Sequence, residues 1–557
     1  MARRCRAEGH GFSGLWEVFV PFGLDVSQVP FGSKYGFRIH TASGLDVVKM
    51  DPYAQEFEVP SDLHHSPVFN ASVVSSCDDN YKAEPFAWCD ETWMQEREER
   101  GRLSTTLLQP MAIYEVHLPS WRRGANGEML NYRDLAKQLV EHVKALNFNW
   151  VELMALAHHP FLGSWGYQVS GYYSCYSQLG SPDDLKHLIN ELHQAGIGVI
   201  MDFVPAHFCK DACSFCDFDG TPTFEYEDPR EGEQRQWGTK VFAFRRNEVR
   251  SFLIGAALFW AERYHIDGFR CDAVSSMIYR NFGKAEGEWI PNEHGGDSNL
   301  EAVSLLRELN KSMKQFWPGV VMIAEESTAW EGVTSLKPAS SGLGFDLKWD
   351  LGWMNDTLIY LEEPGWNKPA NHSKLTFRAQ YMQNERFVLP LSHDEVANMK
   401  GSLLEKMGKK ERTWASTSAS ACSVLSTASK PRRRGGRCSS WAKNTAKGEN
   451  GTATNRWIGT RVRRRPEKAS ACGCRTSWQC TDTTRRCMWE TTFRSRSSSR
   501  WATAASSGWR TTRGPASWAS AGTGRASARC WPSATSGTST TTATPSVART
   551  GEAGRCC

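Results

Sequence analysis

Residues 197–207 read Ile-Gly-Val-Ile-Met-Asp-Phe-Val-Pro-Ala-His, an apolar run that ends in the polar residues Asp202 and His207. The run has the length and the β-branched content of a strand that is buried on both faces. Three other apolar runs end in the same way, followed by Arg270 with Asp272, by Glu325, and by His393 with Asp394. Because these side chains follow buried parallel strands, we expect them to meet at one end of a barrel, where enzymes of this fold place their chemistry.

Strands alternate with helices between Met111 and Leu391. The expected strands cover 112–117, 148–156, 197–204, 266–271, 320–324, 345–349 and 387–391. Helices with an apolar residue at every third or fourth position are expected between them, at 135–146, 181–196, 252–264 and 304–316. The helix at 181–196 begins with a capping Ser181-Pro182 pair and ends at Gly196. Seven strands with helical crossovers predict an α/β fold, a (β/α)8 TIM-type barrel, which needs an eighth strand to close.

The N-terminal residues have a different pattern. Residues 12–60 alternate apolar and polar side chains, as in Leu15–Val20 and Tyr35–His40. This predicts the strands of a small β-sandwich, and its abrupt start favours a truncated one. Residues 78–105 are polar and charged, which favours a linker. We therefore expect a partial β-sandwich at 1–95 and the barrel at 96–408.

The C-terminal part differs from the rest of the chain in composition and charge. Residues 411–557 hold 22 Arg and 4 Lys against 6 acidic residues, a net charge of about +20, whereas residues 1–410 carry about −15. Six Leu, Ile, Val or Phe residues are too few for a core, and nine Trp are too many for ordinary disorder. A basic arm for nucleic acid is one alternative. We favour another, an out-of-frame translation of a GC-rich gene.

Codons read from the third base of each printed codon support the second alternative. In that frame Trp441–Lys447 can encode Gly-Gln-Glu-Tyr-Gly-Gln, Glu449–Thr452 can encode Glu-Trp-Asn, and Trp457–Gly459 can encode Asp-Trp. Just upstream, Arg437–Ser440 can encode an apolar strand. We therefore expect a frameshift between about residues 408 and 436. The eighth barrel strand is then missing from the printed frame, and a disordered tail occupies 409–557.

The polar residues at the strand ends fit a retaining glycosidase chemistry. This chemistry needs one carboxylate as nucleophile and one carboxylic acid that protonates the leaving oxygen. Asp272 is the candidate nucleophile, and Arg270, on the same face of the strand, is expected to pair with it and keep it ionised. Glu325 is the candidate acid and base. Asp394 is the candidate that binds sugar hydroxyls as the ring distorts.

Four further residues are expected around the same sugar. His207 and His393 are candidate hydrogen-bond donors, Asp202 would orient Arg270 or the loop, and Tyr167 in Trp-Gly-Tyr-Gln is a candidate stacking platform. Structural alternatives exist for single residues: a loop cap for Asp202, a loop histidine for His207, a core residue for Tyr167, an ion pair for Arg270 with Asp272, and exchanged roles for Glu326 and Glu395. Four motifs in order at strand ends favour the site over these alternatives.

The cysteines and the apolar runs indicate which cellular compartment the chain would occupy. Eight cysteines precede residue 410 at irregular spacings, which indicates a reducing compartment. Cys209, Cys213 and Cys216 with His207 suggest zinc, but we favour a cysteine-rich loop because a fourth ligand at metal-site spacing is missing. No secretory signal is visible, and the longest apolar run, 252–261, is too short for a membrane span. The acidic first part gives no reason to expect nucleic acid or membrane as a partner.

Residues 12–408 resemble the α-amylase superfamily (glycoside hydrolase family 13), and most closely its 1,4-α-glucan branching enzymes. The four superfamily regions match Asp202–His207, Gly268–Val274, Ala324–Thr328 and Leu391–Val396. Three stretches narrow the resemblance to branching enzymes: Trp165–Val169, Asn292–Asn299 with its Gly-Gly, and Lys348–Asp356. The β-rich N-terminal part resembles the family 48 carbohydrate-binding module that precedes such barrels.

The resemblance implies a role for each matching residue. Asp272 takes the place of the nucleophile, Glu325 that of the acid and base, and Asp394 that of the transition-state stabiliser. The substrate-binding places fall to Tyr167, Asp202, His207, Arg270 and His393. The implied reaction cleaves an α-1,4 glucan, holds the chain as a covalent glycosyl-enzyme, and transfers it to a 6-hydroxyl to make an α-1,6 branch, as in glycogen or starch biosynthesis.

The resemblance also implies partners and a compartment. It implies an α-glucan polysaccharide as substrate, no metal or organic cofactor, and a monomer in the cytoplasm, or in a plastid if a targeting segment is missing. The alternatives are an α-glucan hydrolase of the debranching type and a non-catalytic glucan-binding remnant. The family's eighth strand and C-terminal β-domain are absent from the printed frame, so we expect the printed chain to be unstable and inactive.

Overall fold

The structure is a computed structural model that describes residues 8–9, 16–17, 31–59, 71–75, 85–334, 342–397, 400–408 and 437–438. The chain divides into two units, Met1–Arg464 and Arg465–Cys557, and the described residues all lie in the first. The tail predicted for 409–557 therefore lies outside the described residues, except for Arg437–Cys438.

A parallel sheet of seven strands forms the centre of the first unit. In chain order the strands are β7 (Ala112–Val116), β8 (Trp150–Leu153), β11 (Gly198–Phe203), β15 (Gly268–Cys271), β16 (Val321–Ala324), β17 (Leu347–Trp349) and β18 (Phe387–Val388). Each strand pairs in parallel with the next one. Every one of them lies within a strand predicted from the sequence, which confirms the predicted parallel sheet.

Two residues pair with the free edge of β7. Arg437–Cys438 forms a strand, β19, that pairs in parallel with β7 through Arg437 with Ala112 and Cys438 with Ile113. Seven strands thus form the predicted sheet, and among the described residues β19 adds only this two-residue pairing at its edge, since an edge strand offers backbone donors and acceptors to any extended segment. Among the described residues the ladder runs from β18 to β19, with no pairing between those two ends.

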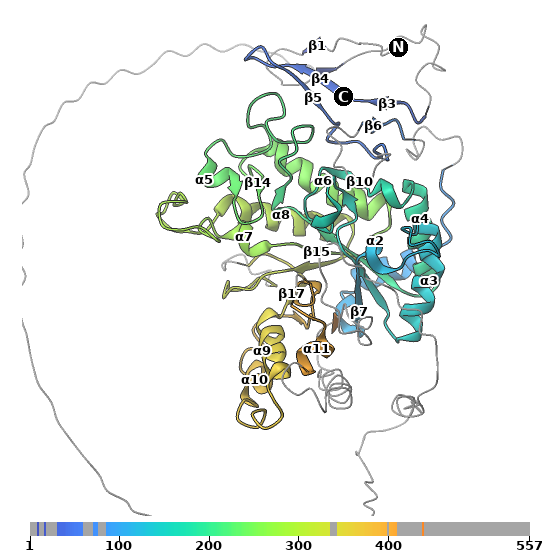
Figure 1. Ribbon diagram of the computed structural model, residues 1–557, viewed down its shortest axis with the longest axis vertical. Helices are drawn as coiled ribbons and strands as arrows, with labels where there is room; N and C mark the ends of the chain where they lie inside the picture. The colour runs from blue at the N-terminus through green and yellow to red at the C-terminus, as the bar shows by residue number, and fades with distance from the viewer. Residues whose placement is uncertain are drawn as a thin grey trace, which may run out of the picture. The chain divides into compact units, whose positions relative to one another are not determined.

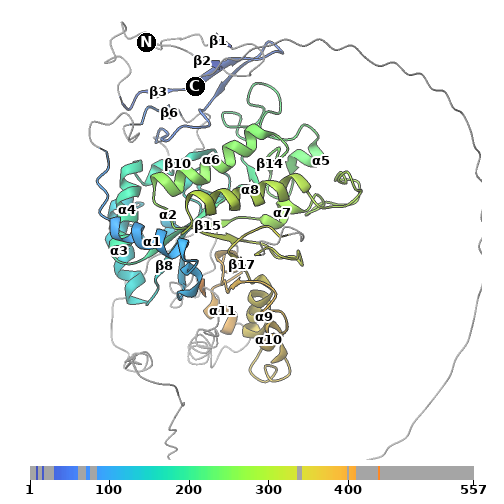
Figure 2. The same cartoon turned by 180° about the vertical axis from the view of Figure 1, so that it is seen from behind.

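Helices cover the sheet as the crossover pattern predicts. The larger ones are α3 (Tyr132–Ala145), α4 (Pro182–Gln194), α6 (Asn247–Arg263) and α8 (Leu300–Phe316). Helix α3 packs on α4, and α6 lies beside α8, as Figure 2 shows. Ser181 caps α4 through a reciprocal pair of hydrogen bonds with Asp184. Helix α6 starts five residues before its predicted start, because its first turn is polar and lacks the apolar period.

Smaller elements complete the barrel part of the chain. They are the helices α2 (Leu118–Trp121), α5 (Pro229–Gly232) and α7 (Val274–Ile278), the antiparallel pair β9 (Ala157–His158) with β10 (Gly171–Cys175), and the small sheet of β12 (His207–Phe208), β13 (Glu233–Gln234) and β14 (Thr239–Val241). Helices α9 (Leu351–Glu362), α10 (Ser373–Thr376) and α11 (Leu403–Gly408) follow β17 and β18 and gather together in Figure 1.

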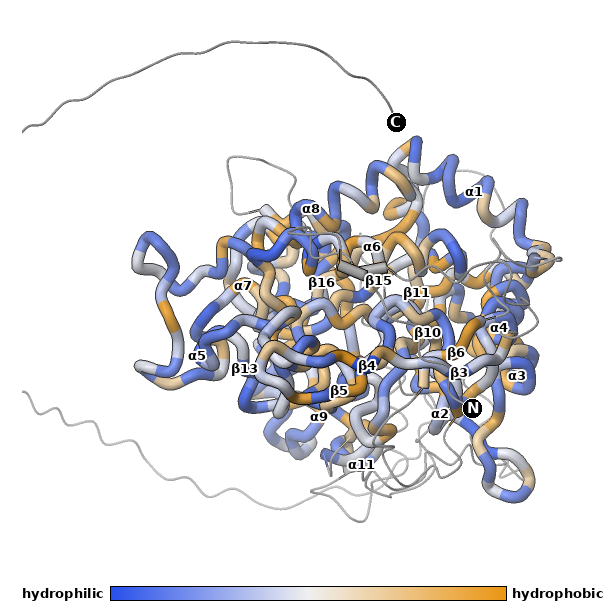
Figure 3. Tube along the Cα trace, turned by 90° about the horizontal axis from the view of Figure 1, so that it is seen from above, coloured by the Kyte–Doolittle hydropathy of each residue, from blue (hydrophilic) through white to orange (hydrophobic). Residues whose placement is uncertain are grey.

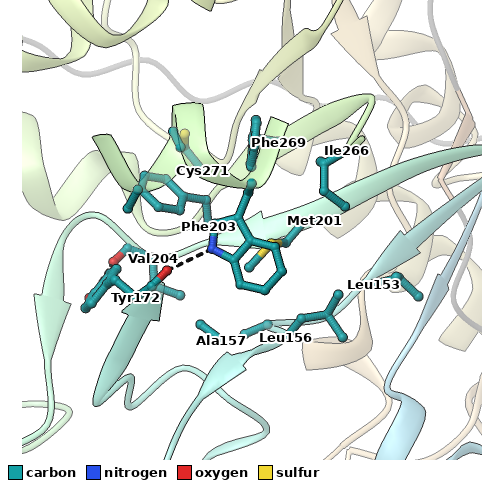
Figure 4. Close-up of a cluster of buried hydrophobic side chains, with 14 of the residues drawn as sticks. Leu153, Leu156, Ala157, Tyr172, Met201, Phe203, Val204, Ile266, Phe269 and Cys271 are labelled. Carbon is teal, nitrogen blue, oxygen red and sulfur yellow. Dashed lines mark hydrogen bonds between the residues drawn. The ribbon is translucent and has the colours of Figure 1, made fainter. Parts of the chain in front are cut away.

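The core lies between α6 and the strands β8, β11 and β15. Trp260 of α6 is fully buried, and its Nε1 donates a hydrogen bond of 2.8 Å to the carbonyl oxygen of Tyr172. Figure 4 shows Met201, Phe203 and Phe269 in this cluster, with the hydrogen bond dashed. Burying a side chain of this size stabilises the fold by about 1.5–3 kcal/mol, so the strands and α6 are held together mainly by apolar contact.

The predicted linker contains a helix. Residues Glu91–Arg102 form α1, which has no apolar stripe and appears mostly hydrophilic in Figure 3. Arg100 pairs with Glu96 one turn earlier at 3.0 Å. Arg97 is 4% exposed, and its Nη1 donates to Asp267 Oδ1 at 3.1 Å. Because ion pairs rather than an apolar stripe hold α1, its sequence lacks the 3.6-residue apolar repeat of an amphipathic helix. The sequence pattern therefore favoured a linker.

The N-terminal part consists of antiparallel strand pairs. They are β1 (Glu8–Gly9) with β2 (Trp16–Glu17), β3 (Lys34–Tyr35) with β6 (Ser72–Val73), and β4 (Phe37–His40) with β5 (Asp46–Lys49). The predicted β-rich character is confirmed. The assignment to a carbohydrate-binding module and the domain boundaries at 95 and 408 stay predictions.

A buried ionic network lies at the N-terminal end of the barrel strands. His193 at the end of α4 binds Asp90 Oδ2 through Nδ1 at 2.7 Å and Asp267 Oδ2 through Nε2 at 2.8 Å. Burial lowers the pKa of His193, but the two carboxylates outweigh it and raise the pKa above its ordinary value. Burial raises the pKa of Asp267, but His193 and Arg97 outweigh it and bring the pKa to about 2. The network therefore ties α1, α4 and β15 together as ions.

We predict that His193→Gln lowers stability by about 3 kcal/mol, because it leaves two buried carboxylates without their shared cation. A histidine whose pKa is raised in the folded state stabilises the fold fully below its ordinary pKa of about 6.5, and this stabilisation is lost as the pH rises through its pKa in the folded chain. The two carboxylates have lowered pKa values, so their stabilising effect is lost only as the pH falls below about 4. Thermal unfolding should therefore show the largest deficit between about pH 4 and pH 6.5.

The matched control is His187→Gln, on the same helix and only partly buried, which should unfold like the parent chain. An equal deficit for His193→Gln at pH 5.5 and at high pH would contradict the ionic account.

Candidate active site

One guanidinium organises the carboxyl ends of the central strands. Arg270 of β15 is 1% exposed. Its Nη1 donates to Asp202 Oδ2 at 2.9 Å and to Asp272 Oδ1 at 3.1 Å, and its Nη2 donates to Glu325 Oε2 at 2.7 Å. The strands β11 and β15 pair Asp202 directly with Arg270, so the sheet register itself places this contact. Three predicted site residues are thus held by one cation.

Two aromatic rings flank the guanidinium. Its carbon lies 4.3 Å from the centroid of the Trp349 ring and 5.7 Å from that of Tyr167. The hydroxyl of Tyr167 donates to Asp202 Oδ2. A buried arginine stacked between rings has little freedom to rotate, so the directions of its donors are fixed.

A tight turn presents Tyr167 to the site. Trp165 and Gly166 both have positive φ values, 55° and 95°. A Cβ added to Gly166 would lie 2.3 Å from the carbonyl oxygen of Ala155, so only glycine fits there. The Trp-Gly-Tyr-Gln stretch is therefore a turn whose backbone conformation sends the tyrosine ring into the barrel mouth.

A second strained residue connects the nucleophile and acid candidates. Ala273, directly after Asp272, has φ at 51°, and its N–H donates to Glu325 Oε2 at 2.9 Å. A non-glycine residue in this conformation costs on the order of 1–3 kcal/mol. The strained turn gives Glu325 a backbone donor in addition to Arg270.

The remaining predicted residues join the same constellation. His207 Nε2 lies 3.9 Å from Asp272 Oδ2. The ring of His393 stacks on that of Tyr167 at 5.5 Å, and its Nε2 lies 3.4 Å from Asp394 Oδ1. The structure thus brings together all eight predicted site residues. Their individual roles, including that of Tyr167 as a sugar platform, stay predictions.

The pKa of Asp272 differs from the expectation. Burial raises this pKa well above its ordinary value, Arg270 acts in the opposite direction, and neighbouring carboxylates add to the rise. The predicted contact with Arg270 exists, but the expected net effect was wrong, because one guanidinium does not outweigh burial among several carboxyl groups. Asp394 is different, since His393 holds its pKa below the ordinary value.

Two buried glutamates below the site were missed by the sequence reasoning. Glu115 on β7 and Glu152 on β8 are paired in the sheet register and are 1% and 0% exposed. Burial raises the pKa of Glu152 well above its ordinary value, and Asp202 and Glu115 add to the rise. The signal that could have identified them is a charged residue within an apolar parallel strand, which has no solvated face for it.

One group outside this site has the ligand atoms of a metal centre. Among the described residues, Cys216, Asp217 and Glu225 bring a thiol and two carboxylates within 4.8 Å of one another. The ammonium of Lys49 donates to the carbonyl oxygen of Cys216 at 2.6 Å, so a cation already lies against this loop. Cys209 and Cys213 do not belong to the group, and the zinc alternative with three cysteines gains no support.

Known proteins are similar to this chain over most of its length. Residues 138–237 match the family described as alpha amylase, catalytic domain. The chain is 46% identical over 405 residues to the 1,4-alpha-glucan branching enzyme GlgB of Marinobacter nauticus, a match that covers 73% of this chain and 60% of that protein. It is 48% identical over 397 residues to the enzyme of the same name from Nocardia farcinica, covering 71% of this chain and 49% of the relative.

A solved structure shares the fold. The crystal structure of a putative alpha amylase from Salmonella typhimurium superposes with a TM-score of 0.53 at 19% identity, covering 80% of this chain and 68% of that one. The chain spans about half the length of most of the branching enzymes that it matches. It thus has the barrel fold of the α-amylases, and over 397 to 407 residues it is similar to 1,4-α-glucan branching enzymes.

Proposed function

We propose that this site is that of a 1,4-α-glucan branching transferase. The observation that carries the proposal is the position of Asp272 and Glu325 on the two nitrogens of one buried guanidinium. A retaining mechanism needs two carboxyl groups close together on opposite sides of the cleaved bond. The similarity to branching enzymes at 44–48% identity supports the choice of substrate and reaction.

In the proposed first step, a carboxylate oxygen of Asp272 attacks C1 of the glucose at the cleaved α-1,4 bond. Glu325 gives its proton to the leaving 4-oxygen, so the shortened glucan departs as an alcohol and a glycosyl-Asp272 ester remains. Asp394, which keeps its negative charge, would bind ring hydroxyls that move as the sugar flattens. His207 and His393 would donate to the same sugar.

In the second step, Glu325 acts as base. It takes the proton of an acceptor 6-hydroxyl, the acceptor oxygen attacks C1, and the Asp272 carboxylate leaves, which forms the α-1,6 branch. Water as the acceptor would give hydrolysis by the same route, so a hydrolase of the debranching type is the enzymatic alternative. The 46% identity to a branching enzyme over 405 residues favours transfer.

The proposal includes an α-glucan polysaccharide as the partner, a monomeric state and a cytoplasmic location. Homologous branching enzymes support the glucan substrate. None of the helices among the described residues is both long and apolar enough to span a bilayer.

We further propose that the residues from about 409 onward are an out-of-frame replacement for strand eight and the C-terminal β-domain. The composition of 411–557 supports this, with its nine Trp and only six Leu, Ile, Val or Phe residues. So does the position of β19, since Arg437–Cys438 pairs beside β7 at the point where the alternative frame can encode an apolar strand.

Site variants test the reaction in the frame-corrected chain. We predict that Asp272→Asn and Glu325→Gln each lower branching by about a thousandfold or more, because each removes a group that makes or breaks the glycosidic bond. Branching is measured as loss of the iodine colour of amylose without release of reducing sugar. The control Glu98→Gln changes a side chain that is 53% exposed, on α1, and should leave activity unchanged. Near-parental activity of Asp272→Asn, or a large rise in reducing ends, would refute the proposal.

The nucleotide sequence across codons 400–440 tests the frame. We predict a gained or lost base between about codons 408 and 436, after which one frame encodes an apolar strand followed by Gly-Gln-Glu-Tyr-Gly-Gln. The printed chain should be inactive in the iodine assay, and the frame-corrected chain active. A single intact frame as printed, with an active and cooperatively unfolding product, would contradict this.

A further inference from the structure

Glu115 makes an unusually complete contact with one residue of the site. It lies near the end of β7, and its side chain has no exposure to solvent. Its Oε1 lies 2.5 Å from Nδ1 of His393, and its Oε2 accepts a 3.0 Å hydrogen bond from the backbone N–H of the same residue. Both carboxylate oxygens of Glu115 are thus used to hold one histidine, which is 278 residues away in the chain.

The contact determines which nitrogen of His393 is available. Nδ1 faces Glu115, so the nitrogen that remains on the side of Asp394 is Nε2, at 3.4 Å from Oδ1. A carboxylate faces each nitrogen, and this arrangement favours a proton on both, as in an imidazolium. Burial lowers the pKa of His393, but Asp394 and Glu115 outweigh it and raise the pKa to about 9.

Other groups also face the ring. Tyr167 stacks on it with an interplanar angle of 8°, and Trp165 meets it edge to face. The charged and titratable groups around it are Glu115 from β7, His117 after β7, Asp202 from β11, Arg270 from β15 and Asp394 from its own segment. Arg270 disfavours a positive charge on His393, so the two adjacent carboxylates are what maintains it.

We propose that Glu115 is a positioning residue that fixes His393 as an imidazolium and directs its Nε2–H toward a sugar hydroxyl at the cleaved bond. The sugar in this statement rests on the proposed function. The contact has a second consequence, because it connects the end of β7 to the segment after β18, the two strands that flank the eighth position of the sheet. A purely structural bridge would use the same contact, so the test must separate the two roles.

The variant Glu115→Gln in the frame-corrected chain separates them. Glutamine keeps the shape and the hydrogen bond to the backbone N–H but removes the charge. The titration of His393 is followed by NMR of histidine-labelled protein, with the signal identified by its loss in His393→Gln. We expect the titration to move from about pH 9 toward the ordinary value of about 6.5. In Glu115→Asp, which restores the charge, the titration should return part of the way.

Maltoheptaose binding gives the second measurement. At pH 8 the imidazolium persists in the parent chain but not in Glu115→Gln, so we expect binding about tenfold weaker or more in the variant. At pH 5.5 the ring is protonated in both chains, and the difference should largely disappear. The control Glu225→Gln changes another glutamate with 0% exposure, outside the site, and should alter neither the titration nor the pH dependence of binding.

An unchanged His393 titration in Glu115→Gln would overturn the proposal, as would an equal loss of binding at both pH values, which indicates a structural bridge. If the His393 titration shifts in Glu115→Gln but the parent chain binds no maltoheptaose at either pH, the positioning role is supported. The missing binding would then count against the proposed glucan function.

Discussion

The site depends on one buried cation. Arg270 is the guanidinium to which Asp202, Asp272 and Glu325 are all hydrogen-bonded, and its plane is fixed by the ring of Trp349. Removing such a cation would leave several carboxylates together in a region of low dielectric constant, a cost of several kcal/mol. The paired register of β11 and β15 determines where the guanidinium lies. The sheet pairing and the packing of the aromatic rings therefore fix the position of Arg270, and the positions of the three carboxyl groups depend on it.

The two ends of the barrel use charge differently. At the N-terminal end of the strands, His193 lies between Asp90 and Asp267, and Arg97 supplies further positive charge, so the carboxylates there have lowered pKa values. At the opposite end the carboxyl groups outnumber the cations, and burial raises the pKa of Asp202, Asp272 and Glu152. The first arrangement stabilises the fold. The second one gathers carboxyl groups with raised pKa values at the candidate site, as is common in functional sites.

Most of the fold and the candidate site could be predicted from the sequence, because apolar strands that end in polar residues carry both signals at once. Helix α1 could not, since it is held by ion pairs and by buried Arg97 rather than by an apolar face. Glu115 was missed because its role depends on a residue after β18, a contact that no local pattern encodes. The pairing of Arg437–Cys438 with β7 was missed because backbone hydrogen bonds are indifferent to side chains. The raised pKa of Asp272 was missed because it depends on how many carboxyl groups the fold brings near it.

We propose that Arg270 holds Asp272 as the group that becomes covalently bonded to glucose. The most direct measurement treats the frame-corrected chain with 5-fluoro-α-glucosyl fluoride, which forms a glycosyl-enzyme faster than it is released, and locates the added mass by peptide mass spectrometry. We expect one 5-fluoroglucosyl ester, on Asp272. An ester on Glu325, Glu326 or Asp394, with Asp272 unmodified, would contradict it.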